Sequence, residues 1–399
     1  MSAEVGRRAR SAARQQGERS PAKHSEVHRQ IYLVPGFFGF SRLGGLNYFQ
    51  GVADALREAL AQHRIDAEIL ECRTKPTASI RRRASRLLDE VRGGGGLEAD
   101  ELYFIGHSTG GLDARLATTP GVRLRPDTLE LRIEERTRSV ITVATPHFGT
   151  PLASFFTTIL GRQLLELLAA LATSRGGRAG LIGSAQLIGL LARAEELAGR
   201  EGTFLAFLTR TVLDRATDAG DDLWTYLREM GSDQGALVQL MPEAMHLFNA
   251  SVTEDEAIHY GSLLTIAPPP PAAYGGDNPL SLGRAALASA FSFLYALTAR
   301  EHRQYPYPDP AEEISLRHRS DVPLPLDAGS NDGIVPTLSQ IHGHVIDLVV
   351  ADHLDIVGQF DREDLRHGDW LPSGSHFDRS RFERAWGAVA AEIAKVAAD

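Results

Sequence analysis

The residues best suited to chemistry lie in the segment 103–111, which reads Tyr-Phe-Ile-Gly-His-Ser-Thr-Gly-Gly. The apolar start of this segment predicts a buried strand, and the residues that follow Ser108 recur at helical spacing. A serine between such a strand and helix, with glycines two positions before and after it, is typical of a nucleophile elbow. The glycines allow close backbone approach, and the helix N-terminus favours negative charge in front of the serine. Ser108 is therefore the predicted nucleophile, although a motif this short also occurs by chance.

The other members of a catalytic triad must come from later in the chain. A serine hydroxyl needs a base to take its proton, usually a histidine that a buried carboxylate orients. After an elbow of this kind the acid comes first and the histidine second, on loops that follow late strands. Asp332, in a Gly-Ser-Asn-Asp-Gly turn, and His353, directly after the last apolar strand, fit that order. The rivals are His376, in a loop beyond the sheet, and Asp327, whereas Asp352 lies too close to His353 in the chain.

A glycine-containing loop precedes the elbow and is the candidate oxyanion site. The apolar strand 31–34 ends in the loop 35–39, which reads Pro-Gly-Phe-Phe-Gly. An oxyanion is held by two backbone N–H groups, one from such a loop and one from the residue after the nucleophile. We therefore assign the two donors to Phe37 and Thr109, each worth about 3 kcal/mol of barrier. An ordinary Pro-Gly turn is the alternative interpretation.

Strands and helices alternate along residues 31–150 and again along residues 251–399, which we interpret as two parts of one core. Alternation at these lengths predicts parallel strands joined by helices, and hence an α/β fold with a mostly parallel central sheet and helices on both faces. The predicted strands outside the elbow are 31–34, 67–72, 140–144, 258–266 and 345–350, and the predicted helices are 47–63, 78–92, 286–299 and 379–397.

Residues 151–250 interrupt this alternation. Leucine and phenylalanine recur here at helical spacing, which predicts a helical cap inserted into the core. The cap either packs on the core alone or forms a lid with an apolar inner face. Residues 1–30 are polar and rich in arginine, and we expect a disordered tail there; contact with an anionic surface is the alternative.

Composition narrows the class of protein further. The chain has 399 residues, a formal net charge of -9 and a pI near 5.9, which argues against nucleic acid as the partner. No apolar run is long enough to span a bilayer. The single cysteine excludes an internal disulfide, and no segment of signal-peptide type is evident. We therefore expect a cytoplasmic protein.

Taken together, these motifs resemble those of the bacterial true lipases of the α/β-hydrolase superfamily. The resemblance extends from residue 31 to about residue 359. It is carried by the elbow and by the segments 144–150, 237–249, 329–335 and 353–355. It implies the α/β-hydrolase fold, with Ser108, Asp332 and His353 as the triad. Thr109 and Pro35 stand where typical members carry glutamine and histidine.

The resemblance also implies a structural calcium ion. In the resembling lipases, positions that match Asp355 and Gln359 contribute oxygens to an ion that ties down the histidine loop. Calcium takes six to eight oxygen ligands, so a further carboxylate is expected upstream, with Asp309 and Asp321 as candidates. Alternatively, Asp355 pairs with an arginine such as Arg362 or caps its turn. No cofactor is expected for catalysis itself.

The activity expected from these residues is hydrolysis of carboxylic esters. Ser108 would attack the ester, His353 would relay the proton, Asp332 would orient His353, and water would release the acyl-enzyme. The expected substrate is a small-molecule or lipid ester, with transient contact to a lipid surface. The alternatives are hydrolysis of a polyester or thioester, acyl transfer to an alcohol, or a catalytically silent binding protein.

Overall fold

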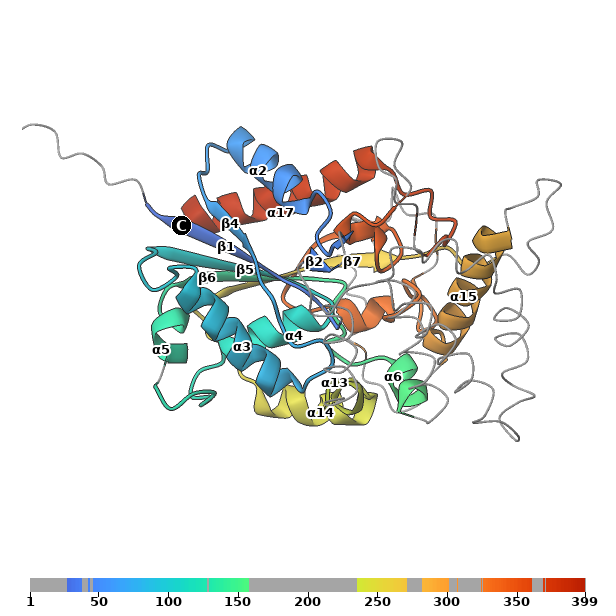
Figure 1. Ribbon diagram of the computed structural model, residues 1–399, viewed down its shortest axis with the longest axis horizontal. Helices are drawn as coiled ribbons and strands as arrows, with labels where there is room; N and C mark the ends of the chain where they lie inside the picture. The colour runs from blue at the N-terminus through green and yellow to red at the C-terminus, as the bar shows by residue number, and fades with distance from the viewer. Residues whose placement is uncertain are drawn as a thin grey trace, which may run out of the picture.

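A six-stranded sheet forms the centre of the computed structural model, in the order β4-β1-β5-β6-β7-β8 (Figure 1). The structure describes residues 27–37, 42, 43, 46–127, 129–157, 235–270, 282–300, 307, 324, 326–360, 369 and 371–398. All neighbouring strands of the sheet are parallel. The strands are β1 (Arg29–Val34), β4 (Glu68–Glu71), β5 (Glu101–His107), β6 (Thr137–Val143), β7 (His259–Ile266) and β8 (His344–Val350).

Helices cover both faces of the sheet, because successive side chains of its strands point to opposite sides and both sides are apolar. Ile31 and Leu33 of β1 join the apolar cluster that contains α2 (Val52–Gln62) and α17 (Arg379–Ala398). Tyr32 and Val34 join the cluster on the other face. Figure 1 shows α2 and α17 above the sheet and the opposite helices, α3 (Ile80–Gly93), α4 (Thr109–Ala117) and α5 (Leu129–Glu134), below it.

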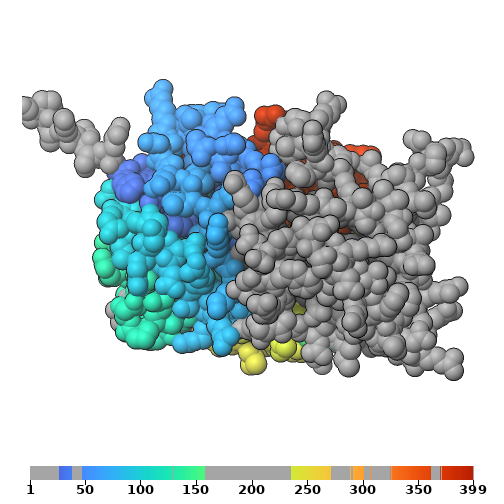
Figure 2. Space-filling view, viewed as in Figure 1, coloured from blue at the N-terminus to red at the C-terminus, as the bar shows by residue number. Residues whose placement is uncertain are grey.

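The remaining described elements lie mainly around the carboxyl ends of the strands. They are the two-stranded ladder of β2 (Arg42–Leu43) and β3 (Leu46–Asn47), the helices α6 (Pro151–Phe156), α13 (Gly235–Gln239), α14 (Pro242–Ser251) and α15 (Leu282–Thr298), and the 3-10 turns η3 (Thr337–Gln340) and η4 (Asp355–Val357). In Figure 2 the segment with α13 and α14 reaches the surface at the lower edge of the molecule. None of the helices described is both long and apolar enough to cross a membrane.

The parallel sheet and its flanking helices confirm the predicted α/β architecture. Two helix starts were wrong. The helix predicted over 47–63 begins at Val52, because Leu46–Asn47 is paired as β3 and Gly51 takes a left-handed turn with φ 77° before the helix. The helix predicted over 286–299 begins at Leu282. The predicted tail, up to residue 26, and residues 158–234 of the predicted cap lie outside the described residues. The cap boundaries therefore stay a prediction.

Parallel strands bring their carboxyl ends to one edge of the sheet, where ligands bind in open α/β folds. The register places Val34 beside Gly106, and Gly106 beside Thr142, so β1, β5 and β6 end at one level. Ile266 of β7 lies beside Val350 of β8. The loops that follow these strands carry the candidate site residues.

Candidate active site

Ser108 lies on the sharp turn between β5 and α4. Its backbone has φ 54° and ψ -130°, an uncommon conformation for a residue with a side chain. Its N–H donates to the Val143 carbonyl at 2.9 Å, which fixes the turn against β6. The predicted strand–turn–helix is present, and backbone strain at such a position is a feature of nucleophile elbows.

Two glycines of the elbow, Gly106 and Gly110, lie where neighbouring backbone leaves no room for a Cβ atom. A Cβ at Gly106 would lie 2.4 Å from the backbone nitrogen of Gly111, at the start of α4. A Cβ at Gly110 would lie 2.2 Å from the carbonyl oxygen of Val34, at the end of β1. Since both contacts are with backbone atoms, the motif's spacing reflects the close packing of β5, α4 and β1.

The candidate oxyanion loop comprises Pro35 to Phe37. A buried arginine, Arg83, holds this loop in place. Nη2 of Arg83 donates to the carbonyl oxygens of Pro35 and Gly36, at 2.8 and 2.9 Å. Its Nε donates to the Asp113 carboxylate on α4 at 2.9 Å, and both side chains are fully buried. Burial raises the pKa of Asp113 to about 6, and Arg83 opposes that rise. The loop and the elbow helix thus share one buried ion pair.

The predicted acid and base are in direct contact. Nδ1 of His353 lies 2.8 Å from Oδ2 of Asp332, and the backbone N–H of His353 donates to the Asp332 carbonyl at 3.0 Å. The remaining bonds to the carboxylate come from the backbone N–H groups of Ile334 and Val335 and from the side chains of Thr265 and Gln340. Because Nδ1 donates to the carboxylate, Nε2 of His353 is the nitrogen left to accept a proton.

Ser108 and His353 line the same pocket, a cavity of about 120 Å³. Phe37 of the oxyanion loop also lines it. The described residues include no direct hydrogen bond between the Ser108 hydroxyl and the His353 ring, and such contacts often tighten only around a substrate. The rest of the lining is mostly apolar: Tyr48, Pro146, Thr150, Leu152, Ala153, Phe156, Leu237, Leu240, Leu294, Ile334, Val335 and Leu354.

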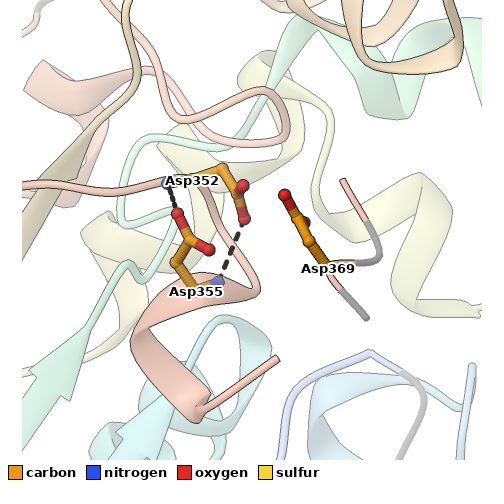
Figure 3. Close-up of side chains that lie close together, drawn as sticks. All are labelled: Asp352, Asp355 and Asp369. Carbon is orange, nitrogen blue, oxygen red and sulfur yellow. Dashed lines mark hydrogen bonds between the residues drawn. The ribbon is translucent and has the colours of Figure 1, made fainter. Parts of the chain in front are cut away.

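Three aspartates lie close together, as Figure 3 shows. Two of them, Asp352 and Asp355, flank His353 in the histidine loop, which is the segment 352–355. Carboxylate oxygens of Asp352, Asp355 and Asp369 lie within 4.8 Å of one another. Oδ2 of Asp355 accepts from the Asp352 N–H at 3.0 Å and from the Ser375 hydroxyl at 2.7 Å. Oδ2 of Asp352 is buried and has no hydrogen-bond partner.

This cluster could hold a metal ion. Burial raises the pKa of Asp352 to about 6, and burial and then the charges of Asp352 and Asp369 raise the pKa of Asp355 well above its usual range. No described lysine or arginine forms an ion pair with Asp352 or Asp355. Carboxylates are preferred ligands of Ca²⁺, and buried like charges call for a compensating cation. An ion here would contact the orphaned oxygen of Asp352.

Comparisons with known proteins agree with this fold. No family model matches the chain. A triacylglycerol lipase of Vibrio cholerae is 29% identical over 131 residues, which are 33% of this chain and 36% of that protein. Lipase 1 from Pelosinus fermentans aligns with 93% of this chain and 99% of its own, with a TM-score of 0.53 and 17% identity. The Staphylococcus hyicus lipase aligns with 95% and 98%, with a TM-score of 0.51 and 16% identity. The chain has the α/β-hydrolase fold of the bacterial lipases.

Of the residues predicted from the sequence, the fold brings Asp332 to His353 and sets His353 in one pocket with Ser108. The rivals lie elsewhere: Asp327 accepts hydrogen bonds from its own turn, and His376 is exposed. Thr109 begins α4, so its N–H is one of the first-turn donors without a partner within the helix. The catalytic roles themselves stay predictions.

The residues of the aspartate cluster differ in part from the calcium ligands implied by the resemblance. Asp355 belongs to the aspartate cluster, but Nε2 of Gln359 donates to the carbonyl oxygens of Asn47 and Tyr48, at 2.8 and 3.2 Å. Asp309, Asp321 and Arg362 lie outside the described residues. Asp352 and Asp369 were not predicted as ligands, although Asp352 and Asp355 flank the histidine at a spacing of three.

Arg83 was also missed. It belongs to an arginine-rich helix, in which neighbours such as Arg81 and Arg82 are exposed. A usable signal was present, because Arg83 shares the apolar stripe of Ile80 and Leu87 at helical spacing. A charge on the buried stripe of a helix indicates a buried partner.

Proposed function

We propose that this chain hydrolyses carboxylic esters through an acyl-enzyme on Ser108. The observation that carries the proposal is the buried Asp332–His353 hydrogen bond beside a strained serine in a largely apolar pocket. A carboxylate that fixes a histidine tautomer next to a serine is the arrangement that activates a hydroxyl for acyl transfer. The partial similarity to a triacylglycerol lipase, over about a third of that relative's length, supports the same class of reaction.

The reaction follows from the atoms of these residues. The Ser108 oxygen attacks the ester carbonyl carbon while Nε2 of His353 takes the hydroxyl proton. The N–H groups of Phe37 and Thr109 stabilise the oxyanion, and His353 returns the proton to the departing alcohol. Water, activated by the same histidine, then cleaves the acyl-enzyme. Asp332 stabilises the imidazolium that forms.

The substrate proposed is an ester with an apolar acyl chain, including lipid esters. Leucine, valine and phenylalanine side chains surround Ser108, and Tyr48 and Thr150 are the other polar side chains of the lining besides the catalytic pair. Each methylene of the acyl chain that enters such a lining gains about 0.8 kcal/mol. Chain length within the lining should therefore affect kcat/KM more than the nature of the alcohol does.

We also propose that a calcium ion held by Asp352, Asp355 and Asp369 stabilises the histidine loop. The ion would supply the positive charge that three facing carboxylates need. It takes no part in the chemical steps. Its proposed role is to hold the segment around His353, which lies between two of its ligands.

The test compares hydrolysis of nitrophenyl acetate, butyrate and octanoate by the wild type and by Ser108→Ala. We expect a fall of more than about 10⁴-fold in kcat, because the nucleophile is lost. Ser139→Ala is the matched control, since Ser139 is a buried serine of β6 whose hydroxyl has no hydrogen-bond partner. Full activity in Ser108→Ala, or an equal loss in Ser139→Ala, would overturn the proposal.

A further inference from the structure

A chain of three hydrogen bonds connects the oxyanion loop to the backbone of the predicted base. The Gly36 N–H donates to the Tyr48 hydroxyl oxygen at 2.9 Å. That oxygen lies 2.7 Å from Nδ1 of His107, and Nε2 of His107 lies 3.0 Å from the His353 carbonyl oxygen. Tyr48 and His107 are buried, and the chain therefore runs through the protein interior.

The direction of each bond follows from the groups that it joins. A carbonyl oxygen only accepts, so Nε2 of His107 carries a hydrogen and donates it to His353. Nδ1 of a neutral ring then has only a lone pair, and it accepts the Tyr48 hydroxyl hydrogen. Burial, and then the neighbouring His353, lower the pKa of His107 well below its usual range. Burial also raises the pKa of Tyr48. Both rings are therefore uncharged near neutral pH.

We propose that Tyr48 and His107 form a bridge that positions His353 and the oxyanion loop relative to Ser108. This inference rests on the proposed function. His107 directly precedes Ser108 in the chain, so its ring is fixed by the same strained turn that orients the nucleophile. Through Nε2 it holds the backbone of the base, and through Tyr48 it holds the residue before Phe37. The bridge thus sets the three parts of the site at fixed separations.

The bridge has little freedom to move. The rings of His107 and His353 pack with centroids 4.6 Å apart. The backbone of Tyr48 is held in turn by Gln359, which donates to its carbonyl, and the Gln50 N–H donates to the Val357 carbonyl at 2.9 Å. The tyrosine segment is therefore attached by its backbone to the loop after His353 and by its hydroxyl to the elbow.

The test is Tyr48→Phe, which removes one oxygen and leaves the ring that lines the pocket. The substitution removes the hydrogen bonds that the Tyr48 hydroxyl makes to the Gly36 N–H and to Nδ1 of His107. A displacement of about 1 Å in a reacting group can cost about 10²-fold in rate, so we expect kcat to fall by about 10- to 100-fold with KM changed by less than about threefold. Rates are counted per site titrated with a fluorophosphonate, so that loss of folded protein does not enter.

Tyr32→Phe is the matched control. Tyr32 is also buried, and its hydroxyl bonds to Gln30 and Val91 on the face of the sheet next to α3. We expect this variant to lose stability but to keep wild-type kcat per titrated site. An unchanged kcat in Tyr48→Phe, or a change confined to KM, would overturn the bridge while leaving the proposed function intact. Absence of Ser108 labelling in the wild type would instead overturn the proposed function.

A second measurement does not depend on activity or on the folding of a variant. In ¹⁵N spectra of the histidine-labelled wild type, the His107 ring should be a single neutral tautomer with hydrogen on Nε2 and a bare Nδ1. A hydrogen on Nδ1, or a charged ring at neutral pH, would contradict the bond directions and remove the bridge.

Discussion

The two halves of the candidate active site are held in place by different kinds of interaction. The nucleophile half comprises β1, β5, the elbow and α4, and its positions are set by backbone contact and one buried ion pair. The base half comprises the loops after β7 and β8. Hydrogen bonds from the side chains of Thr265 and Gln340 hold the Asp332 carboxylate in place there. Three aspartates cluster next to His353.

This difference indicates where each half is vulnerable. Backbone atoms would lie within 3 Å of a Cβ added at the elbow glycines, so the elbow has no room for an added atom, and this packing does not depend on pH or on ions. Buried carboxylates are different, because the free-energy cost of burying their charge depends on whether a proton or a cation neutralises it. We therefore expect changes of size to damage mainly the nucleophile half, and changes of charge or metal to damage mainly the base half.

The largest effect expected in the base half is on catalysis. Asp332→Asn keeps the shape of the side chain but favours the wrong His353 tautomer, so we expect kcat to fall by about 10³- to 10⁴-fold. Asp327→Asn is the control, because Asp327 is the rival acid and accepts only from its own turn in the bonds described. Steady-state kinetics on one nitrophenyl ester measures both. A larger loss in Asp327→Asn would move the acid to that residue.

A change of size should damage the nucleophile half instead. Gly110→Ala adds a Cβ 2.2 Å from the Val34 carbonyl oxygen, and the backbone must shift to relieve it. We expect the free energy of unfolding to fall by about 2–4 kcal/mol. Gly387→Ala is the control, since a Cβ there would meet no atom within 4 Å in α17 and should raise stability by up to about 1 kcal/mol. Equal effects in denaturant melts would refute the packing account of the elbow.

Local features of the site could be predicted from the sequence, whereas most contacts between distant residues could not. The elbow turn was predictable because its requirement for glycine is local, and the contact between Asp332 and His353 was predictable because chain order constrains it. Arg83 and Asp369 were not, since their roles depend on contacts made only after folding. Arg83, for example, donates to Gly36, which is 47 positions away. Tyr48 falls within a predicted helix, but it follows the short β2–β3 ladder and contacts His107, which is 59 positions away.

Calcium should affect the stability of the base half, and we expect this effect to be smaller than that of Gly110→Ala. An ion that binds only the folded state adds about 2.7 kcal/mol at a concentration 100 times its Kd. We therefore expect added Ca²⁺ to raise the melting temperature of the wild type by several degrees relative to chelator. Asp355→Asn should lose most of that rise, whereas Asp66→Asn, an exposed aspartate outside the cluster, should keep it. An equal rise in Asp355→Asn would remove these aspartates as ligands.

The smallest effect expected is the pH dependence contributed by His107. Burial lowers its pKa in the folded state, so below about pH 6.5 the unfolded chain binds the extra proton and stability falls as pH falls. His107→Gln cannot take up that proton. The stability of the wild type should therefore fall more steeply with acid than that of the variant, by up to about 1.4 kcal/mol per pH unit. Parallel curves in saturating Ca²⁺ would show that His107 is not held neutral.

Covalent labelling of the nucleophile tests the proposed reaction most directly. The wild type is treated with a fluorophosphonate until ester hydrolysis stops, and the modified peptide is identified by mass spectrometry. We predict one label per chain, on Ser108, with loss of activity in proportion to labelling. A label on another serine, or ester hydrolysis that continues after Ser108 is fully modified, would contradict the account.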